Sequence, residues 1–335
     1  MRRLTLGSTG IETSAIGFGC AQLTSHRTKR DAIRTLEHAF ELGITHFDVA
    51  RSYGFGRTES FIREFLRPRR NRITVATKFG LQPPSGPLAN NHVIGLAKKL
   101  CSPFPKILQF ARQRGSAMVR AGAFQPDTAI RSLEKSLREL GTDYVDMFLL
   151  HEAEVRDAED PSLIEVLDKE VQRGTVRCLG IASDCEKLAG KIDQIPASYQ
   201  VLQFNDNAVN RNSSRCVHSR ARAWITYSVF KPLAIISNAT ASHPNVVRKF
   251  SSRIGADLTN DAIISSLLLA YASQSNSAGV TLFSTTNPAH LATNVSASGG
   301  CRYEDGQILI FLEFLDEILR REPVLAGTGT RGLRP

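Results

Sequence analysis

Four polar residues follow apolar, strand-like runs in the first half of the chain. Asp48 lies in the run ITHFDV, Lys78 ends RITVATK, His151 directly follows YVDMFLL, and Tyr53 comes five residues after Asp48. If these runs are neighbouring parallel strands of a barrel, their carboxyl ends lie at the same end of it. The spacing therefore predicts that a carboxylate, an ammonium, an imidazole and a phenol meet at one site.

These four groups together suit proton transfer to a carbonyl oxygen. A free tyrosine has a pKa near ~10, and a neighbouring ammonium favours the phenolate, so we expect Lys78 to lower the pKa of Tyr53. Asp48 can hold Lys78 charged and oriented, and a neutral His151 can form a hydrogen bond to a carbonyl group. Tyr53 would then protonate the oxygen while hydride reaches the carbon from a cofactor. By contrast, we expect His46 to be a structural residue.

Apolar, strand-like runs alternate with helical patterns along the chain. Helical patterns occupy residues 30–43, 126–141 and 161–174, and each of them ends at a glycine. The strand-like runs cover residues 14–19, 44–49, 72–78, 144–150, 175–182, 199–205, 223–228 and 279–284. Eight strands alternating with helices predict an α/β fold, a single (β/α)8 TIM barrel. The predicted fold also includes an N-terminal β-hairpin.

A doubly wound parallel sheet is the competing fold. It would carry a Gly-x-Gly-x-x-Gly turn directly after its first strand. The nearest candidate, GFGCAQL at 17–23, lacks the third glycine, which favours the barrel. We expect the barrel domain to cover residues 1–325, with a long loop after strand three at 79–125 that shapes the site, and a disordered tail at 326–335.

The composition argues against membrane and metal-binding classes. The chain is 42% hydrophobic and 22% charged, which is typical of a globular protein. It shows neither an apolar signal segment nor a run of ~18 apolar residues, so we expect a cytoplasmic protein without a membrane partner. Six cysteines form no Cys-x-x-Cys pair and eight histidines form no His-x-x-x-His pair, which indicates reduced thiols and no metal site.

The formal net charge is +10. Nucleic-acid binding would require basic residues gathered on one face with aromatic residues between them. Here they are spread along the chain, and the densest run is RPRRNR at 67–72. We therefore expect no nucleic-acid partner, and a basic surface that attracts an anionic cofactor or substrate.

The segment GITHFDVARSYGFGRTE (43–59) resembles the strand-two signature of the aldo-keto reductase superfamily, with its Asp, Tyr, Gly and Glu in register. The resemblance extends over residues 4–295. It implies a catalytic tetrad of Asp48, Tyr53, Lys78 and His151. It also implies an NAD(P)H-dependent oxidoreductase that interconverts an aldehyde, ketone or sugar with an alcohol by hydride transfer, with Tyr53 as general acid/base.

The same resemblance implies a dinucleotide that extends across the barrel mouth without a Rossmann domain. NADPH is the expected cofactor, and NADH is the alternative. Ser183 and Gln203 match the positions that hold the nicotinamide. The pyrophosphate positions are matched by Ser228, Phe230 and Lys231. The positions around the 2′-phosphate are matched by Ser284, Thr285, Asn287, His290 and Asn294.

Two residues depart from the family pattern. Asp184 replaces an asparagine that holds the nicotinamide carboxamide, and an ionised aspartate can accept from an amide but cannot donate to it. Asp206 matches the position of an aromatic residue that stacks on the nicotinamide ring. These departures favour a second hypothesis, a non-catalytic or regulatory barrel similar to the potassium-channel β-subunits, whereas the complete tetrad favours an enzyme.

The loop after Lys78 resembles loops of bacterial members that oxidise sugars to lactones or reduce pyridoxal-like aldehydes. The substrate is therefore expected to be a small polar carbonyl compound or a sugar. The sequence leaves the net direction of the reaction and the oligomeric state open.

Overall fold

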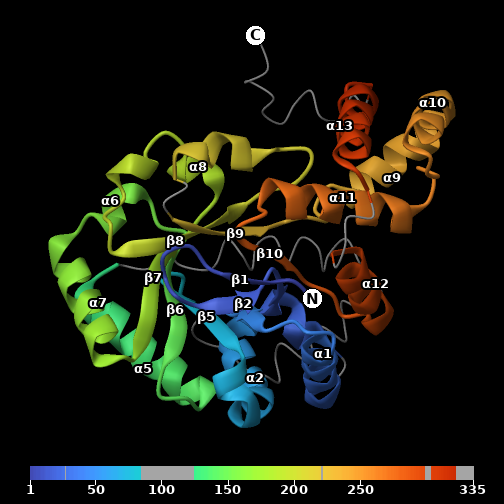
Figure 1. Ribbon diagram of the computed structural model, residues 1–335. Coiled ribbons are helices and arrows are strands. Elements are labelled where there is room, and N and C mark those ends of the chain that lie inside the picture. The colour runs from blue at the N-terminus through green and yellow to red at the C-terminus, as the bar shows by residue number, and fades with distance from the viewer. Residues whose placement is uncertain (27, 84–123, 220–221, 299–302, 322–335) are drawn as a thin grey trace.

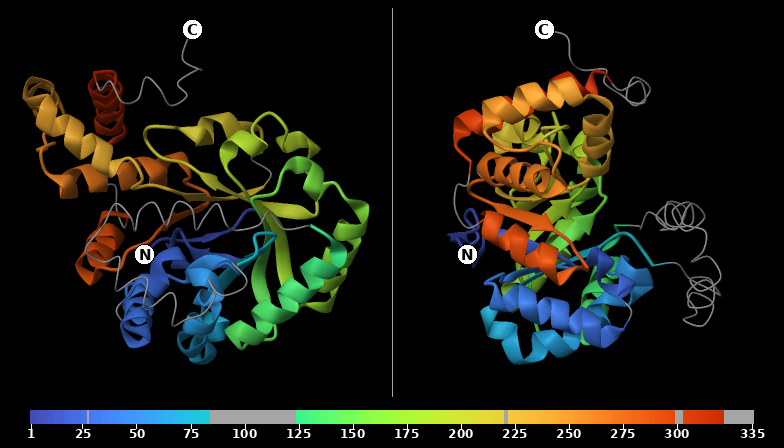
Figure 2. Two further views of the ribbon diagram at one scale, coloured as in Figure 1. Left: turned by 180° about the vertical axis from the view of Figure 1, so that it is seen from behind. Right: turned by 90° about the vertical axis from the view of Figure 1, so that its right-hand side faces the viewer.

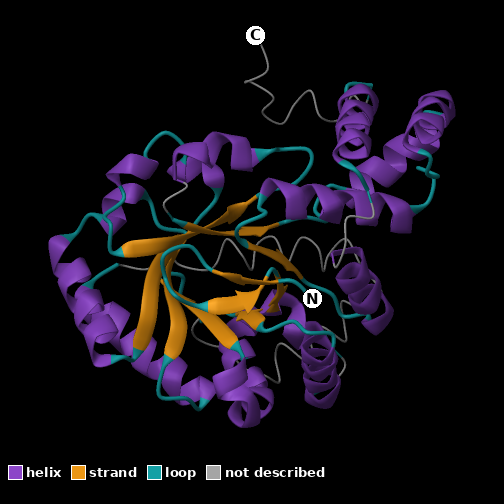
Figure 3. Cartoon of the chain, viewed as in Figure 1, coloured by secondary structure: helices purple, strands orange, loops and turns teal. Residues whose placement is uncertain are grey.

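Eight parallel strands close into a barrel in the computed structural model (Figure 1 and Figure 3). The structure describes residues 1–26, 28–83, 124–219, 222–298 and 303–321. The barrel strands are β3 (Ile16–Gly19), β4 (His46–Asp48), β5 (Thr74–Phe79), β6 (Val145–His151), β7 (Val176–Ala182), β8 (Tyr199–Asn205), β9 (Ala223–Tyr227) and β10 (Val280–Phe283). They pair in chain order, and β10 pairs with β3 to close the barrel. Each predicted strand run overlaps an observed strand, which confirms the TIM barrel.

An antiparallel hairpin of β1 (Arg3–Thr5) and β2 (Glu12–Ser14) precedes the barrel, as predicted. Leu6 and Ile11, in the turn of this hairpin, are fully buried. They belong to the same apolar cluster as Ala223, the first residue of β9. The hairpin therefore closes the end of the barrel at which the strands begin.

Helices surround the barrel. They are α1 (Lys29–Glu41), α2 (Thr58–Leu66), α5 (Pro126–Leu140), α6 (Val155–Ala158), α7 (Pro161–Arg173), α8 (Cys185–Leu188), α9 (Leu233–Ser242), α10 (Pro244–Ile254), α11 (Asp261–Ser275), α12 (Pro288–Ser298) and α13 (Asp305–Leu319). Short 3₁₀ helices are η1 (Cys20–Ser25), η2 (Tyr53–Gly56), η3 (Arg67–Arg72), η5 (Ile192–Gln194) and η6 (Asn212–Ser219). The three predicted helices correspond to α1, α5 and α7. The last two of these end at Gly141 and Gly174, whose φ angles of 68° and 78° are typical of a glycine after a helix.

Helices from the last third of the chain extend beyond the barrel. α10 and α13 lie side by side at one edge of the molecule, away from α5 and α7 (Figure 1 and Figure 2). The rings of Phe250 in α10 and Phe314 in α13 are 5.6 Å apart. This lobe therefore has apolar contacts of its own, on a side of the molecule where no barrel strand runs.

Two predictions fall largely outside the described residues. The long loop is described only at its ends, 79–83 and 124–125, while the domain boundary at 325 and the tail 326–335 are outside the described ranges. Along the described part of the chain, no helix combines the length and apolarity needed to cross a membrane.

Gly180 marks a close approach between two barrel strands. The pairing of β7 with β8 shifts register between Leu179 and Gly180. A Cβ atom at Gly180 would press against the backbone oxygen of Val201 and lie 2.7 Å from Leu149 Cδ2. We expect Gly180→Ala to lower the free energy of unfolding by about 1–3 kcal/mol, the usual cost of overpacking, as measured by urea denaturation.

Gly306 in α13 offers a matched control. A Cβ atom there would meet no described atom within 4 Å. Because alanine favours helix over glycine, Gly306→Ala should leave stability unchanged or raise it by up to about 1 kcal/mol. Equal destabilisation by both substitutions would contradict the packing explanation for Gly180.

Candidate active site

The alternation of side chains along the strands puts three of the predicted residues inside the barrel. Lys78 and His151 are each two residues beyond inward-facing apolar residues, Ala76 and Leu149. Because successive side chains of a strand point to opposite faces, this even spacing keeps them on the inner face. Asp48 ends the neighbouring strand β4. Asp48, Lys78 and His151 are only 2%, 2% and 8% exposed.

Lys78 lies at the centre of the site. Its Nζ donates to Asp48 Oδ1 at 2.5 Å, to the backbone oxygen of Val49 at 3.0 Å and to the Tyr53 hydroxyl oxygen at 3.1 Å. The other oxygen of Asp48 accepts from Gln203 Nε2 at 2.8 Å. The expected pairing of Asp48 with Lys78 is therefore present, and all three donors of the ammonium are used.

A left-handed turn positions Tyr53. The two residues that follow it, Gly54 and Phe55, have φ angles of 58° and 59°. A side chain at Gly54 would collide with Thr24 and Thr58, so this position requires glycine for space as well as for its backbone angle. Phe55 adopts the same region despite its side chain, a form of local strain that is common at functional sites.

A buried ion pair attaches this turn to the barrel wall. Arg51 Nη1 lies 2.6 Å from Glu59 Oε2, and the other oxygen of Glu59 accepts from Thr77 Oγ1 at 2.7 Å. The side chains of Arg51 and Glu59 are 5% and 1% exposed. Because Thr77 directly precedes Lys78, the pair connects the segment that carries Tyr53 to the strand that carries Lys78.

His151 meets Tyr53 edge to face. The two ring centroids are 5.9 Å apart and the ring planes are inclined by 82°. Burial lowers the pKa of His151 well below its usual range, and the positive charges of Lys78 and Lys187 act in the same direction. Its Nδ1 has no hydrogen-bond partner among the described residues. The imidazole is therefore neutral near pH 7 and able to form a hydrogen bond to a ligand.

The expected lowering of the Tyr53 pKa is wrong. Burial raises the pKa of Tyr53 well above its usual value, and the negative charge of Asp48 adds to this effect. Lys78 does not reverse the shift, because its charge is already paired with Asp48. Tyr53 is therefore a protonated phenol whose oxygen accepts a hydrogen bond from Lys78.

The four predicted catalytic residues, Asp48, Tyr53, Lys78 and His151, line a cavity of about 450 Å³. Five of the ten predicted cofactor residues also line it: Gln203, Ser228, Phe230, Lys231 and Ser284. Oε1 of Gln203 is buried and has no hydrogen-bond partner among the described residues. It is therefore an acceptor available to an amide group of a ligand.

The other five predicted cofactor residues lie outside the cavity wall. The Ser183 hydroxyl donates to the backbone oxygen of Ala153 at 2.6 Å. The remaining ones, near the start of α12 or within it, are Thr285, Asn287, His290 and Asn294. Asn287 Oδ1 accepts from the backbone nitrogen of Ala289 at 3.0 Å, as a helix cap does. This segment continues directly from Ser284 at the cavity edge.

Asp206 does not occupy the position expected for a stacking aromatic residue. Its carboxylate is buried and accepts from the Ser213 backbone nitrogen at 2.9 Å and from Ser275 Oγ at 3.2 Å, and it is not part of the cavity wall. Tyr227, the last residue of β9, supplies an aromatic ring to this wall instead. The Tyr227 hydroxyl donates to Asp184 Oδ1 at 3.0 Å, so the exposed Asp184 holds this ring in place.

Comparison with known proteins agrees with this geometry. Residues 15–308, most of the chain, match the model of the Aldo/keto reductase family. The chain belongs to the aldo/keto reductase family.

Curated relatives of this aldo/keto reductase match part of it. It is similar to the uncharacterized oxidoreductase YqkF of Bacillus subtilis, with 29% identity over 185 residues that cover 55% of this chain and 49% of that protein. It is also similar to the aldo-keto reductase yakc [NADP(+)] of Schizosaccharomyces pombe, with 30% identity over 198 residues that cover 56% of this chain and 46% of the relative. The chain thus spans about half the length of the curated relatives it matches.

Solved structures match the fold over nearly the whole chain. The glycerol dehydrogenase of Gluconobacter oxydans superimposes with a TM-score of 0.70 over 96% of this chain and 97% of that protein, at 15% identity. At this identity the likeness supports the barrel fold alone.

In this aldo/keto reductase, strand alternation separates Tyr227, which lines the cavity, from Asp206, which does not. Tyr227 is two residues beyond the inward-facing Ile225, so it faces the interior. Asp206 is three residues beyond Gln203, an odd number, so it faces away. The Arg51–Glu59 pair had no such signal, because the burial of both groups depends on the packing of α2 against the barrel.

A second cavity, of about 350 Å³, lies at the opposite end of the barrel, where the strands begin. Asp146 is held there by Arg70 and Arg177 at 2.8 Å and 2.7 Å. The remaining donors of Arg70 serve Thr142 and backbone oxygens. The charges of Asp146, Arg70 and Arg177 are therefore paired with one another. The cavity at the carboxyl ends of the strands remains the candidate active site.

We expect His46 to make the stability of this aldo/keto reductase depend on pH. It is fully buried inside the barrel, and neither ring nitrogen has a hydrogen-bond partner among the described residues. Burial lowers the pKa of His46 from 6.5 to about 4. Between pH 6.5 and pH 4, His46 is protonated in the unfolded chain but stays neutral in the folded state. Acidification over this range should therefore lower the free energy of unfolding by about 3 kcal/mol from this residue alone.

The measurement is urea unfolding at several pH values between 4 and 7, for the native chain and for His46→Leu. Leucine is apolar and cannot titrate, so the variant should show a shallower loss of stability on acidification. Identical pH dependence in the two proteins would contradict the role assigned to His46.

Proposed function

We propose that this aldo/keto reductase is an NAD(P)H-dependent oxidoreductase that interconverts the carbonyl group of an aldehyde, ketone or sugar with an alcohol. One observation carries the proposal: Lys78 donates to the Tyr53 oxygen at 3.1 Å inside a cavity wall that also includes His151. A phenol that accepts a hydrogen bond from Lys78 and keeps its own proton can act as a donor to a ligand. A raised pKa suits a group that must carry its proton until reaction.

In the reducing direction, Tyr53 donates its proton to the carbonyl oxygen. Negative charge then develops on the Tyr53 oxygen, and the Lys78 ammonium stabilises it. Asp48 keeps Lys78 charged and oriented, and Gln203 fixes the second oxygen of Asp48. The neutral His151 forms a hydrogen bond to the same carbonyl oxygen and orients it. The oxidation of an alcohol uses these groups in reverse.

The residues of the cavity fit a nicotinamide dinucleotide. The buried Oε1 of Gln203 can accept from a carboxamide, and Tyr227 offers a flat ring beside it. Lys231 and Ser228 can hold phosphate oxygens with a positive charge and a hydroxyl. When bound, the cofactor would supply or accept the hydride at the carbonyl carbon. NADPH is the favoured form, consistent with the NADP(+) in the name of the fission-yeast relative.

Fluorescence titration with NADPH and, separately, with NADH tests this proposal. We expect binding of at least one form, with NADPH tighter. Lys231→Met should weaken both dinucleotides because both contain the pyrophosphate, by about tenfold, the equivalent of ~1.4 kcal/mol. His290→Ala should weaken NADPH alone, if His290 contacts the 2′-phosphate.

Binding of neither dinucleotide would overturn the proposal in favour of a non-catalytic barrel. Equal effects of His290→Ala on both forms would remove His290 from the 2′-phosphate site. Where binding is found, a panel of aldehydes, ketones and sugars identifies the substrate class.

A further inference from the structure

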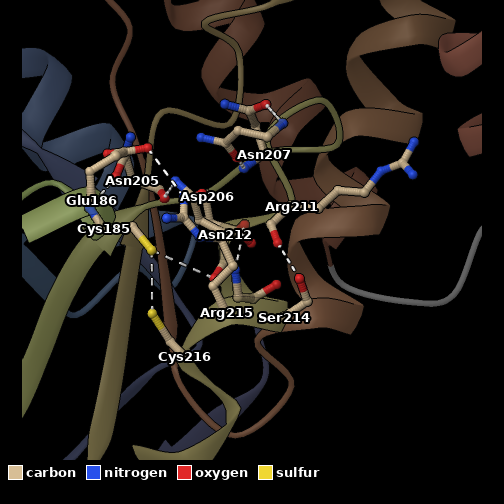
Figure 4. A network of polar contacts seen from close by, with 12 residues as sticks. Cys185, Glu186, Asn205, Asp206, Asn207, Arg211, Asn212, Ser214, Arg215 and Cys216 are labelled. Atoms are coloured by element: carbon tan, nitrogen blue, oxygen red, sulfur yellow. Dashed lines mark hydrogen bonds and ion pairs between the residues drawn. The ribbon is translucent and has the colours of Figure 1, made fainter. Parts of the chain in front are cut away.

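Two cysteines from different loops place their sulfur atoms 3.5 Å apart near the barrel mouth (Figure 4). Cys185 is the first residue of α8, after β7, and Cys216 lies in η6, after β8. Both side chains are fully buried. The two residues are 31 positions apart, so only the fold brings them together.

Hydrogen bonds between side chains and backbone groups attach the two loops to the end of β8. The Cys185 backbone nitrogen donates to Asn205 Oδ1 at 2.8 Å, and Asn212 Nδ2 donates to the Asn205 backbone oxygen at 2.9 Å. The Ser213 backbone nitrogen donates to Asp206 Oδ1 at 2.9 Å. Asn205 thus contacts both loops, and the contact between the sulfur atoms is a supported part of the structure (Figure 4).

The two sulfur atoms are in non-bonded contact. A disulfide has an S–S length of about 2.05 Å, so the atoms would have to approach by roughly 1.5 Å. Side-chain rotation and a small shift of the short segments α8 and η6 can supply such a movement.

We expect Cys185 to be the better nucleophile of the pair. The hydrogen bond with Cys216 lowers the pKa of Cys185, burial opposes this shift, and the nearby positive charge of Arg215 lowers the pKa further. Cys178 differs, because burial and the charge of Asp146 raise its pKa to about 12. Thiolates are the reactive form of cysteine, so oxidation should begin at Cys185.

We propose that Cys185 and Cys216 form a reversible disulfide when the protein meets a peroxide. The Cys185 thiolate attacks a peroxide oxygen and breaks the O–O bond, which gives a sulfenic acid and a hydroxide that takes up a proton to become water. The Cys216 sulfur then attacks the sulfenic sulfur and loses its proton, the S–O bond breaks, and a second water leaves. Two thiols lose two electrons in total, and one hydrogen peroxide is reduced to two waters.

The disulfide would act on the candidate active site through one residue. Asp184 directly precedes Cys185 and accepts a hydrogen bond from Tyr227, whose ring lines the cavity. When Cys185 moves toward η6, the carboxylate that holds Tyr227 moves with it. We therefore expect the oxidised protein to bind NADPH several-fold more weakly. This consequence rests on the proposed function, whereas the disulfide itself does not.

The test uses the full chain carrying Cys101→Ser and Cys301→Ser. Both positions lie outside the described residues, and their thiols could form other disulfides. The protein is treated with hydrogen peroxide and digested with trypsin without reduction. Cleavage after Arg177, Lys187, Arg215 and Arg220 places Cys185 in CLGIASDCEK and Cys216 in CVHSR. We expect these two peptides to be linked, and the link to disappear on treatment with dithiothreitol.

Cys178 occupies the same tryptic peptide as Cys185 and provides the matched control. The link should persist in Cys178→Ser and vanish in Cys185→Ser and in Cys216→Ser. Absence of the link after peroxide treatment, or its persistence in Cys185→Ser, would overturn the disulfide.

Titration of the reduced and oxidised proteins with NADPH then tests the consequence for the site. Equal affinity of the two forms would refute the coupling through Asp184. If neither form binds NADPH or NADH while the linked peptide is found, the proposed function fails and the disulfide stands.

Discussion

Replacing Tyr53 with phenylalanine is expected to lower turnover by a factor of about 10²–10⁴ while cofactor affinity is retained. The substitution removes only the hydroxyl that accepts from Lys78 and that carries the transferable proton in the proposed mechanism. The ring remains, so its edge-to-face contact with His151 is preserved. Lys78 keeps Asp48 and Val49 as acceptors, and the loss of one hydrogen bond should cost no more than ~1.5 kcal/mol of stability.

Steady-state kinetics on a substrate found by screening, together with NADPH titration, provides the measurement. Tyr144→Phe is the matched control, because Tyr144 lies at the opposite end of the barrel, where its ring stacks 3.6 Å from the guanidinium of Arg70. It loses a hydroxyl from the same residue type and should keep full turnover. Unchanged turnover in Tyr53→Phe would remove Tyr53 from the role of general acid.

Replacing Lys78 with methionine is expected to lower the free energy of unfolding by about 3–5 kcal/mol and to abolish most turnover. The Lys78 and Asp48 side chains are 2% and 3% exposed. Without the ammonium, a buried carboxylate remains with Gln203 as its side-chain donor. The energetic cost of removing one partner of a buried pair arises chiefly from this uncompensated charge.

Urea denaturation compares Lys78→Met with two further variants. Lys169→Met breaks an exposed pair with Glu165, whose side chains are 54% and 67% exposed, and should cost less than about 1 kcal/mol. Adding Asp48→Asn to Lys78→Met removes the unpaired carboxylate charge and should restore part of the lost stability. If Lys78→Met costs no more than Lys169→Met, the buried pair does not stabilise the barrel as argued.

Local patterns were enough to predict the barrel and the convergence of Lys78, Asp48 and Tyr53 at one end of it. The strand runs and the helices ending at Gly141 and Gly174 are visible in short windows, because apolar periodicity and glycine caps act over a few residues. Polar residues at strand ends were then expected at one end of the barrel. The observed contacts between Lys78, Asp48 and Tyr53 agree with that expectation.

Other features required the whole fold. The ring that lines the cavity belongs to Tyr227, and Asp206 turns instead toward Ser213 and Ser275. The contact between Cys185 and Cys216 arises only because the loops after two neighbouring strands meet. Each of these depends on which segments lie beside one another, which no single window of sequence contains.

The sequence by itself determined the residue types at the site and the strands that carry them. The tertiary structure decided their protonation. The sequence suggests that Lys78 lowers the pKa of Tyr53, whereas in the folded barrel burial and Asp48 raise it. The reason is physical: the free energy of a charge depends on how completely water is removed from it and on every charge nearby, and both are set only when the barrel closes.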